Sequence, residues 1–370
     1  SLAATSNYNT FFSGGPSRIN PVTGEVISGN ATTTSVTAGL EATLSLPNGY
    51  GTFSSVSTAR HREAQAEAGY EQQRANLELR TTNAFLDALQ AADLMVVRRE
   101  AVTRAEEQFR VALSKLQTRA GNVVDSLQAA ITLGQAQLQL MRQEAQLATA
   151  EATLAALIGE EGRVAAEADS ALFRQVVITD TAALIAEAEQ RSPTVTRAEA
   201  GFRVAEAERR VAKAAYFPVP SLTVGAGTSL RGNTFDHFDR LNNRSFNIGL
   251  SFPIFNGFLR ERNVAEASSR AETARAQTED ARRQVGASMI GRLANLRAAD
   301  RQLEVSITVL EAARANLQVQ IERYRLGSVT SEALNIAQDN LNRAESDAVQ
   351  ARYEYVRARA QIEAVLGRKL

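Results

Sequence analysis

A repeat at an offset of 208 residues (256 − 48 and 367 − 159) constrains this chain more than any other feature of its sequence. Asn48-Gly49 recurs as Asn256-Gly257, and Leu157-Ile158-Gly159 recurs in kind as Val365-Leu366-Gly367. Between these ends, apolar residues spaced seven apart agree in both copies without a gap. The matched pairs are Val102 and Leu310, Phe109 and Leu317, Leu116 and Tyr324, Leu133 and Leu341, Leu140 and Ala348, Leu147 and Tyr355, and Leu154 and Ile362. Because such a stripe packs one helix against another, each copy is predicted to contain long paired helices.

Proline-free stretches show where these helices run. The chain has seven prolines, yet residues 54–192 and 254–370 contain none and are rich in Ala, Leu, Glu, Gln and Arg, a composition that predicts helix. The expected elements are outgoing helices over about 54–118 and 260–326, a returning helix over about 122–158, and shorter helices over about 181–191 and 194–215. Each outgoing helix would be about 100 Å long at about 1.5 Å per residue. Gly121-Asn122 and Gly327-Ser328 mark the turns, since glycine interrupts helical periodicity.

Four segments alternate between apolar and polar residues and therefore predict strands. The clearest alternation runs over 36–46 and 245–254, and weaker alternation runs over 2–12 and 222–230. Each segment has about 9–12 residues, which is the length of a tilted membrane β-strand. The same alternation also fits a half-buried sheet in a soluble protein, so this pattern alone leaves both interpretations open.

Charge and residue usage bear on several classes of function. The chain carries 41 basic and 41 acidic side chains, and this balance gives no support for nucleic-acid binding. It has no cysteine, which excludes disulfides, zinc-thiolate sites and thiol nucleophiles. With only two histidines and no pairing of a nucleophile with a base, we expect no enzyme activity, no metal and no cofactor. No apolar run reaches about 18 residues, so no helix is expected to cross a bilayer.

Such long helices and so few strands do not make a compact globule. Four strands alone leave open edges and do not enclose a lumen. Several chains that pool their strands into one barrel and their helices into one cylinder would solve both problems. Three chains would supply twelve strands, an even number within the range of bacterial barrels.

Three motifs resemble those of the TolC-like outer membrane efflux proteins, or outer membrane factors. They are the turn Arg323-Tyr324-Arg325-Leu326-Gly327-Ser328-Val329-Thr330, the strand end Ser251-Phe252-Pro253-Ile254-Phe255-Asn256-Gly257, and the helix end Ile362-Glu363-Ala364-Val365-Leu366-Gly367. Their order and spacing match over nearly the whole chain. The resemblance implies an α+β membrane protein with internal duplication. It implies a homotrimer whose twelve-stranded outer-membrane β-barrel, with four strands per chain, continues into a long periplasmic α-helical barrel.

The resemblance also implies a division of the chain into segments. The expected segments are 1–53 for barrel strands 1 and 2 with an extracellular loop, 54–158 for a long helix, tip turn and returning helix, 159–192 for an equatorial segment, 193–216 for a tunnel helix, 217–257 for barrel strands 3 and 4 with an extracellular loop, and 258–370 for the second helical hairpin. One departure is plain, because residues 181–218 precede the third strand but no equivalent precedes Ser1. With no signal peptide visible either, we expect the chain as given to be a mature or trimmed fragment.

The function that the resemblance implies is a passive exit duct. Substrates would leave the cell through it when an inner-membrane pump, ABC-type or proton-driven, and a periplasmic adaptor (membrane fusion) protein dock. The barrel would lie in outer membrane lipid, and the helices would extend into the periplasm. Drug efflux and type I secretion share such a duct, and the sequence does not separate them. The alternative is a soluble coiled-coil scaffold or adaptor protein, which has no reason to place ten of its 14 phenylalanines around strands of membrane length.

The resemblance places a gate at the periplasmic helix tips, near the turns at Gly121 and Gly327. The family carries an aspartate on the first returning helix, hydrogen-bonded to a tyrosine just before the second turn, and these positions match Asp125 and Tyr324. A phenol that donates to a carboxylate contributes about 1.5–3 kcal/mol when it is shielded from water. Alternatively, Asp125 is a simple first-turn charge, which is favourable at a helix N-terminus.

Other residues at the tips depart from the family's pattern. Where the family has an arginine and a pair of lumen-narrowing aspartates, this chain has Val329, Ala333 and Ile336. A ring of Ile336 side chains would instead gate by dewetting. Three charged residues are candidate substitutes, although solvated charges on a helix face are the plainer interpretation: Arg325, Glu332 and Asp339.

Aromatic residues near the strand ends are candidates for an interfacial girdle. Tyrosine, tryptophan and phenylalanine gather where a barrel meets the membrane–water interface. The candidates are Phe235, Phe238 and Phe255. Ordinary packing within the barrel or beneath its loops is the alternative.

Overall fold

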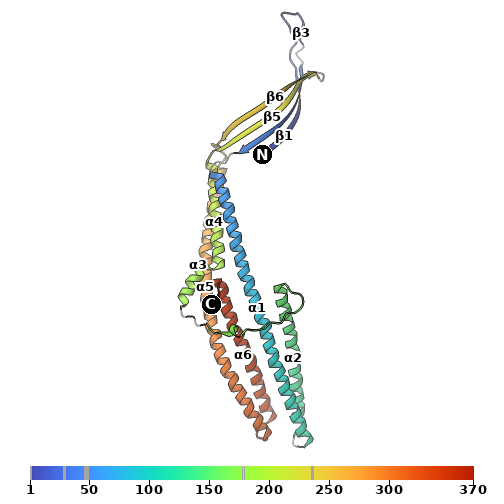
Figure 1. The fold of residues 1–370 in the computed structure, drawn as a ribbon, viewed down its shortest axis with the longest axis vertical. Helices are drawn as coiled ribbons and strands as arrows, with labels where there is room; N and C mark the ends of the chain where they lie inside the picture. Colours follow the sequence, from blue (N-terminus) through green and yellow to red (C-terminus); the bar gives the residue numbers. More distant parts are fainter. Residues whose placement is uncertain are drawn as a thin grey trace. The chain divides into compact units, whose positions relative to one another are not determined.

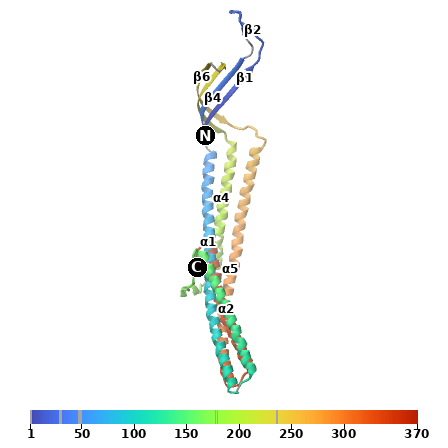
Figure 2. The same cartoon turned by 90° about the vertical axis from the view of Figure 1, so that its right-hand side faces the viewer.

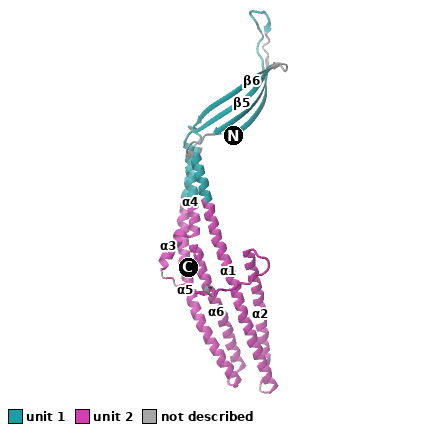
Figure 3. Cartoon of the chain, viewed as in Figure 1, with its two compact units in different colours: residues 1–63, 201–274 teal, residues 64–200, 275–370 magenta. Residues whose placement is uncertain are grey.

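The computed structural model describes residues 2–27, 31–45, 50–119, 121–176, 178, 180–234 and 237–370. Most of these residues lie in helices, and a four-stranded sheet accounts for most of the others. The chain divides into two compact units (Figure 3). Unit 1 comprises residues 1–63 and 201–274, and unit 2 comprises residues 64–200 and 275–370.

Unit 1 contains an antiparallel sheet with the strand order β1-β4-β5-β6 (Figure 1). Its strands are β1 (Leu2–Ser13), β4 (Ala31–Ser45), β5 (Val219–Thr234) and β6 (His237–Ser251). A separate hairpin of β2 (Arg18–Ile19) and β3 (Val26–Ile27) lies in the connection from β1 to β4. Because β1 and β6 are outermost, each has one edge without a partner strand in the described part of the chain.

The two faces of this sheet have opposite character. The register pairs Leu40 with Ala226 and Leu222 with Ile248, so apolar side chains from successive strands share one face, here called the apolar face. Leu40 is 58% exposed and Ile248 is 73% exposed, so the described part of the chain leaves these apolar side chains largely uncovered. Small and polar residues occupy the opposite, polar face, among them Thr43, Thr223 and Asn247.

Glycines on the polar face show which way the sheet bends. A Cβ atom added to Gly227 would lie 3.0 Å from the Ala38 carbonyl oxygen, and one added to Gly225 would lie 2.6 Å from the Ser245 hydroxyl oxygen. Neighbouring strands therefore converge on this side, and glycine permits their close approach. The polar face is concave and the apolar face is convex.

Four long helices form two hairpins. The first hairpin is α1 (Tyr50–Gln117) and α2 (Val123–Ile158), and the second hairpin is α5 (Leu259–Arg325) and α6 (Ser331–Leu366). Their ends keep the offset of 208 residues, from 117 to 325, from 123 to 331 and from 158 to 366. The duplication predicted from the sequence is therefore present in the helix boundaries. Within the described residues, no helix combines the length and the apolar character needed to cross a membrane.

The largest apolar core lies in unit 2, where the second hairpin packs against α1. Seven of its side chains are at most 1% exposed: Leu86 of α1, Met289 of α5, Tyr353, Val356 and Ile362 of α6, and Ala188 and Val195 of the segment between the two hairpins. A smaller cluster joins α1 to α2 through Ala84, Ala88 and Leu154. The second hairpin therefore holds most of the buried apolar surface.

The segment between the two repeats is held against α6. The short helix η1 (Ser170–Phe173) brings the edge of the Phe173 ring to the Tyr353 ring, with centroids 5.5 Å apart. The Val176 amide donates to the Tyr355 hydroxyl oxygen at 2.8 Å. The helices that follow are α3 (Thr181–Arg191), α4 (Pro193–Lys213) and η2 (Ala214–Tyr216).

Helix α4 lies between α1 and α5, as Figure 2 shows. Toward α1, the Gln72 side chain donates to the Thr194 hydroxyl oxygen at 3.2 Å. Toward α5, Arg282 donates to the Glu199 carboxylate at 2.6 Å. Polar side chains thus join three helices that are far apart in the sequence.

Three strands differ in extent from the prediction. The strand expected over 36–46 spans Ala31–Ser45. The strand expected over 245–254 spans His237–Ser251 and ends before Pro253, because proline has no amide hydrogen to donate to a ladder. The strand expected over 222–230 spans Val219–Thr234. The repeated pair Asn48-Gly49 lies outside the described residues.

Candidate functional site

The turn of the second hairpin has a glycine-terminated helix end. Gly327 has a φ of +74°, and its amide donates to the Tyr324 carbonyl oxygen at 3.1 Å. The Ser328 amide donates to the Arg323 carbonyl oxygen at 2.8 Å, which completes a Schellman motif. The hydroxyl of Thr330 then accepts from the Ala333 amide and caps α6. The predicted turn at Gly327 therefore depends on the conformational freedom of glycine.

The turn of the first hairpin also contains a residue in the left-handed conformation, but this residue is not a glycine. Its left-handed residue is Arg119, with a φ of +60°, and not Gly121. Arg119 stands 208 positions before Gly327, and its amide donates to the Leu116 carbonyl oxygen at 3.1 Å. Gly121 is required for space instead, because an added Cβ would lie 2.9 Å from the Lys115 Cβ. The two glycines that mark the turns in the sequence are therefore not equivalent.

Two side-chain contacts join the hairpins at their tips. Lys115, in the last turn of α1, donates to the Tyr324 carbonyl oxygen at 3.0 Å, and its Nζ lies 3.7 Å from the centroid of the Tyr324 ring. The hydroxyl of Ser331, the first residue of α6, donates to Asp125 Oδ1 of α2 at 2.5 Å. Lys115 and Ser331 were not among the predicted site residues. No periodicity marks them, since each is an ordinary polar residue at a helix end.

The predicted bond between Asp125 and Tyr324 is absent. Among the hydrogen bonds of the described residues, the carboxylate of Asp125 accepts from Ser331, and none joins it to the Tyr324 phenol. The two groups are still close enough to interact electrostatically. Burial raises the pKa of the Tyr324 phenol above its ordinary value of 10.0, and the negative charge of Asp125 raises this pKa further. Because Tyr324 is only 8% exposed, its ring acts as a packing element as well as a polar one.

The other predicted tip residues face outward from the single chain. Arg325 forms an exposed ion pair at 3.1 Å with Glu322, one helical turn earlier. Glu332 lies in the first turn of α6, where a negative charge is favourable. Ile336 is 55% exposed, and Asp339 is exposed as well. Within the described chain, these residues make no contact with Asp125 or Tyr324 through a hydrogen bond or an ion pair.

Further from the tips, α1 and α6 meet through polar pairs. Gln108 donates to the Asn335 side-chain oxygen at 2.6 Å. Arg104 donates to Glu345 at 2.7 Å and to Asn342 at 2.8 Å, and Glu345 is only 5% exposed. These residues are also absent from the sequence-based candidates, because a buried ion pair has no local sequence signature. The seam between the hairpins is thus polar over this stretch.

One of the three girdle candidates has a described side chain. Phe255 is 71% exposed, and its ring meets that of Phe258 edge-on at a centroid distance of 5.4 Å. Phe235 lies outside the described residues, and so does the side chain of Phe238. The girdle therefore stays a prediction.

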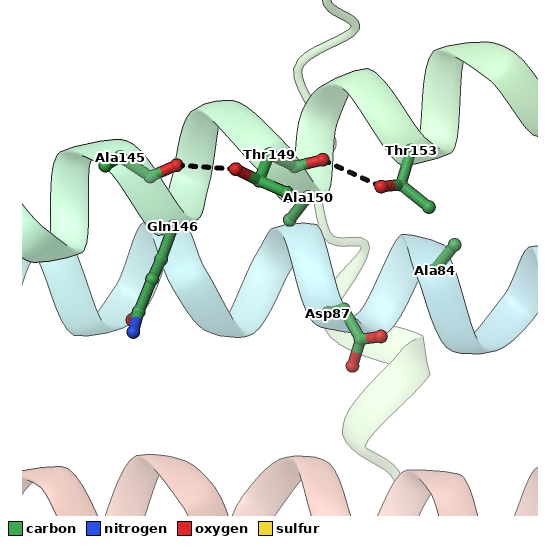
Figure 4. Close-up of a pocket in the computed structure, with 7 residues that line it drawn as sticks. All are labelled: Ala84, Asp87, Ala145, Gln146, Thr149, Ala150 and Thr153. Atoms are coloured by element: carbon green, nitrogen blue, oxygen red, sulfur yellow. Dashed lines mark hydrogen bonds between the residues drawn. The ribbon is translucent and has the colours of Figure 1, made fainter.

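A groove of about 370 Å³ between α1 and α2 has no reactive side chain in it (Figure 4). The hydroxyls of Thr149 and Thr153 donate to carbonyl oxygens of their own helix. The Asp87 carboxylate accepts from Arg357. Across the described residues, no three His, Cys, Asp or Glu side chains gather in a way that would hold a metal ion.

Comparison with known proteins identifies the family. Residues 17–160 and 184–368 match the family described as "Outer membrane efflux protein". The chain is 29% identical over 292 residues to the pyoverdine export outer membrane protein OpmQ of Pseudomonas aeruginosa. The matched region covers 77% of this chain and 60% of OpmQ. It is 27% identical over 240 residues to protein CyaE of Bordetella pertussis, and this matched region covers 64% of this chain and 49% of CyaE. The chain thus spans about half to three fifths of the length of these curated relatives.

Solved structures have the same fold. The structure of CusC matches all of this chain and 83% of its own, with a TM-score of 0.81 and 19% identity. The outer membrane protein VceC of Vibrio cholerae also matches all of this chain and 87% of its own, with a TM-score of 0.74 and 15% identity. This chain belongs to the outer membrane efflux protein family, as its resemblance to the TolC-like proteins predicted. Its location is the bacterial outer membrane, with an extension into the periplasm.

Proposed function

We propose that the chain is one protomer of a trimeric exit duct that conducts substrates passively across the outer membrane. The observation that carries this proposal is the two-faced sheet. Its convex face is apolar and uncovered, its concave face is polar, and its outer strands leave two open edges. A barrel with lipid outside and water inside needs this arrangement.

Three copies would remove the open edges. Four strands of 12 to 16 residues are long enough to cross a membrane at a tilt, but one such sheet does not close. Pairing β6 of one protomer with β1 of the next would give a closed barrel of twelve strands. Segments 1–53 and 217–257 would form this barrel, and segments 54–158, 159–192, 193–216 and 258–370 would form the helical tunnel with its equatorial segment.

A gate at the helix tips would control the duct. Lys115 with Tyr324 and Asp125 with Ser331 tie the two hairpins of one protomer together. Hydrogen bonds to charged groups contribute about 1.5–3 kcal/mol each, so a few of them hold a closed state that docking contacts can open. The outward-facing residues would line the lumen or meet the neighbouring protomer: Arg325, Glu332, Ile336 and Asp339.

The duct itself would supply no energy and no catalysis. We infer that an inner-membrane pump, ABC-type or proton-driven, selects the cargo and that a periplasmic adaptor protein joins the pump to the helix tips. One relative, OpmQ, is named for pyoverdine export, which favours export of small molecules by this chain as well. Protein export would use the same conduit, because the cargo is chosen before it enters.

Reconstitution tests this proposal directly. The purified chain should require detergent, run as a trimer by light scattering, and form ion-conducting pores in planar bilayers. A matched variant should retain the pore but change its gating, and Asp125→Ala is suited to this because it removes the tip bond to Ser331. A protein that stays soluble without detergent and forms no pores would contradict the duct and favour the soluble scaffold.

A further inference from the structure

Two arginines interrupt the apolar face of the sheet. Arg240 and Arg244 lie four residues apart on β6, so strand alternation places both on one side. The register pairs Arg240 with Leu230 and Arg244 with Ala226, and both partners belong to the apolar face. The side chain of Arg240 confirms its side, because Nε donates to the Thr228 hydroxyl oxygen at 3.3 Å.

No other charged residue shares this face in the paired strands. The rows that hold Arg240 and Arg244, and the row between them, otherwise contain Ala, Leu, Val, Ser, Thr and Tyr, with the uncharged Asn242 between the two arginines on β6. The acidic residues of the sheet, Glu41 and Asp239, have register positions on the polar face. Both arginines are exposed, and neither has an ion-pair partner among the described residues. The hydrogen bond from Arg240 Nε leaves most of that guanidinium's donors available.

The position of the pair along the strand indicates its depth. β6 runs from the β5–β6 connection, near Arg240, to Ser251, where the chain turns into α5. Phe246, Ile248 and Leu250 occupy the half of the face nearer the helices. At about 3.3 Å per residue and a tilt of about 40°, Arg240 lies about 25 Å above Leu250, which is the height of the apolar band of such barrels. Arg244 lies within the upper part of that band.

An unpaired arginine facing lipid is unfavourable unless an anion meets it there. We propose that Arg240 and Arg244 bind the phosphate groups of an outer-leaflet lipid headgroup. This inference rests on the proposed function, because the duct orientation turns the β5–β6 connection away from the cell. A guanidinium matches a phosphate through two parallel N–H donors, and two arginines about 13 Å apart along the strand would bind phosphates of one headgroup or of two neighbours.

The test measures how tightly phosphorylated lipid stays on the purified full chain. The probe is a glycolipid with two phosphates, the lipid A of the outer leaflet, titrated into detergent micelles and counted by native mass spectrometry. We expect the double substitution R240Q/R244Q to weaken lipid A binding about tenfold or more, the loss of two charge-assisted contacts. R240K/R244K keeps both charges but loses the paired N–H donors of each guanidinium, so its binding of lipid A should be about threefold weaker than that of the original chain, between the original chain and R240Q/R244Q.

Arg231→Gln is the matched control. Arg231 is an exposed arginine near the same end of the sheet, but its register partner Asp239 places it on the polar face. Its substitution should leave lipid A binding unchanged. Circular dichroism and trimer mass, measured on every variant, separate loss of binding from loss of folding, and the lysine variant reports on the site even if the glutamine variant misfolds.

Three results would overturn the lipid site. The first is that R240Q/R244Q retains as much lipid A as the unsubstituted chain. The second is that the unsubstituted chain binds dephosphorylated lipid A as tightly as intact lipid A. The third is that inorganic phosphate displaces lipid A. Pore conductance of the unsubstituted chain is recorded from the same preparation. Conductance without specific lipid retention removes only this inference, whereas absence of pores removes the proposed duct.

Discussion

The two returning helices, α2 and α6, occupy equivalent places in the repeat and have 36 residues each, yet their surroundings differ greatly. In α6, 15 residues are buried, whereas in α2 only six are buried. Helix α2 instead exposes a row of large apolar side chains, including Leu127, Ile131, Leu138 and Met141, each more than half exposed. Duplication preserved the backbone, while side-chain contacts made α6 a core helix and left α2 available to a neighbour.

This difference teaches that one chain is an incomplete packing unit. Large apolar patches on a water-exposed helix are typical of interaction surfaces. In the proposed trimer, α2 would pack against the next protomer, and α6 would stay inside its own. The following substitutions compare the two hairpins, from the largest expected effect to the smallest.

Ile362→Ala should produce the largest loss of stability. Ile362 is fully buried on α6, so its truncation leaves a cavity and should lower the free energy of unfolding by about 3–4 kcal/mol. Urea unfolding in detergent, followed by circular dichroism, measures the loss. Ile131→Ala on α2 is the matched control, because Ile131 is 53% exposed. It should cost the protomer less than about 1 kcal/mol but lower the trimer fraction by light scattering. Equal losses from the two substitutions would erase the distinction between these helices.

Glu345→Ala tests the polar seam between α1 and α6. Removal of this buried carboxylate leaves Arg104 without its main partner, and the free energy of unfolding should fall by about 3 kcal/mol. Glu332→Ala, an exposed acid on the same helix, should change it by less than about 0.5 kcal/mol. If both variants unfold at the same urea concentration, the seam contributes nothing specific.

Ser331→Ala tests the contact between the tips of α2 and α6. Loss of the donor to Asp125 should weaken the closed state by about 1.5–2 kcal/mol and raise the open probability of single channels. Asp125→Ala should have the same effect, because it removes the acceptor. Ser328→Ala, in the adjacent exposed turn, should leave gating unchanged. Unaltered conductance and antibiotic leakage in both Ser331→Ala and Asp125→Ala would exclude this gate.

Arg119→Gly compares the two turns. The left-handed backbone of Arg119 is strained, so glycine there should stabilise the first hairpin by about 0.5–1 kcal/mol. Gly327→Ala introduces the same strain in the second hairpin and should destabilise it by about 1 kcal/mol. Thermal melts report both changes. Shifts of the same sign would show that the two turns do not share one backbone requirement.

Alkaline pH should loosen the tips through Tyr324. Below pH 10.0 the phenol is protonated in both folded and unfolded chains, so stability does not change with pH through this group. Above pH 10.0, the unfolded chain loses the phenol proton first, because burial and the charge of Asp125 raise the pKa of Tyr324 in the folded chain. The free energy of unfolding therefore falls as the pH rises. Limited proteolysis at the tips measures the loosening. Tyr324→Phe should abolish it, and a step that persists in this variant would show that Tyr324 is not its source.

Much of the fold was predictable because its signals are local and periodic. Heptad spacing and the absence of proline identified the long helices to within a few residues. Alternation identified the four strands, although it missed both ends of β6, the first residues of β4 and the full length of β5. The offset of 208 residues in the sequence is enough to align both hairpins, because helix ends depend on residues close in sequence.

The site was less predictable, because its contacts join residues far apart in the chain. Asp125 and Tyr324 were candidates through a resemblance, yet their partners in the structure are Ser331 and Lys115. Nothing in the sequence near Glu345 indicates that it is buried with Arg104, which is 241 positions away.

By itself, then, the sequence determined the duplicated helices and strands of this protein. Tertiary structure alone decided that the polar face of the sheet is concave, that Arg119 and not Gly121 takes the left-handed turn, and that α6 is buried while α2 is exposed. The physical reason is that local backbone preference acts through neighbouring residues, whereas curvature, burial and pairing arise only where distant segments meet.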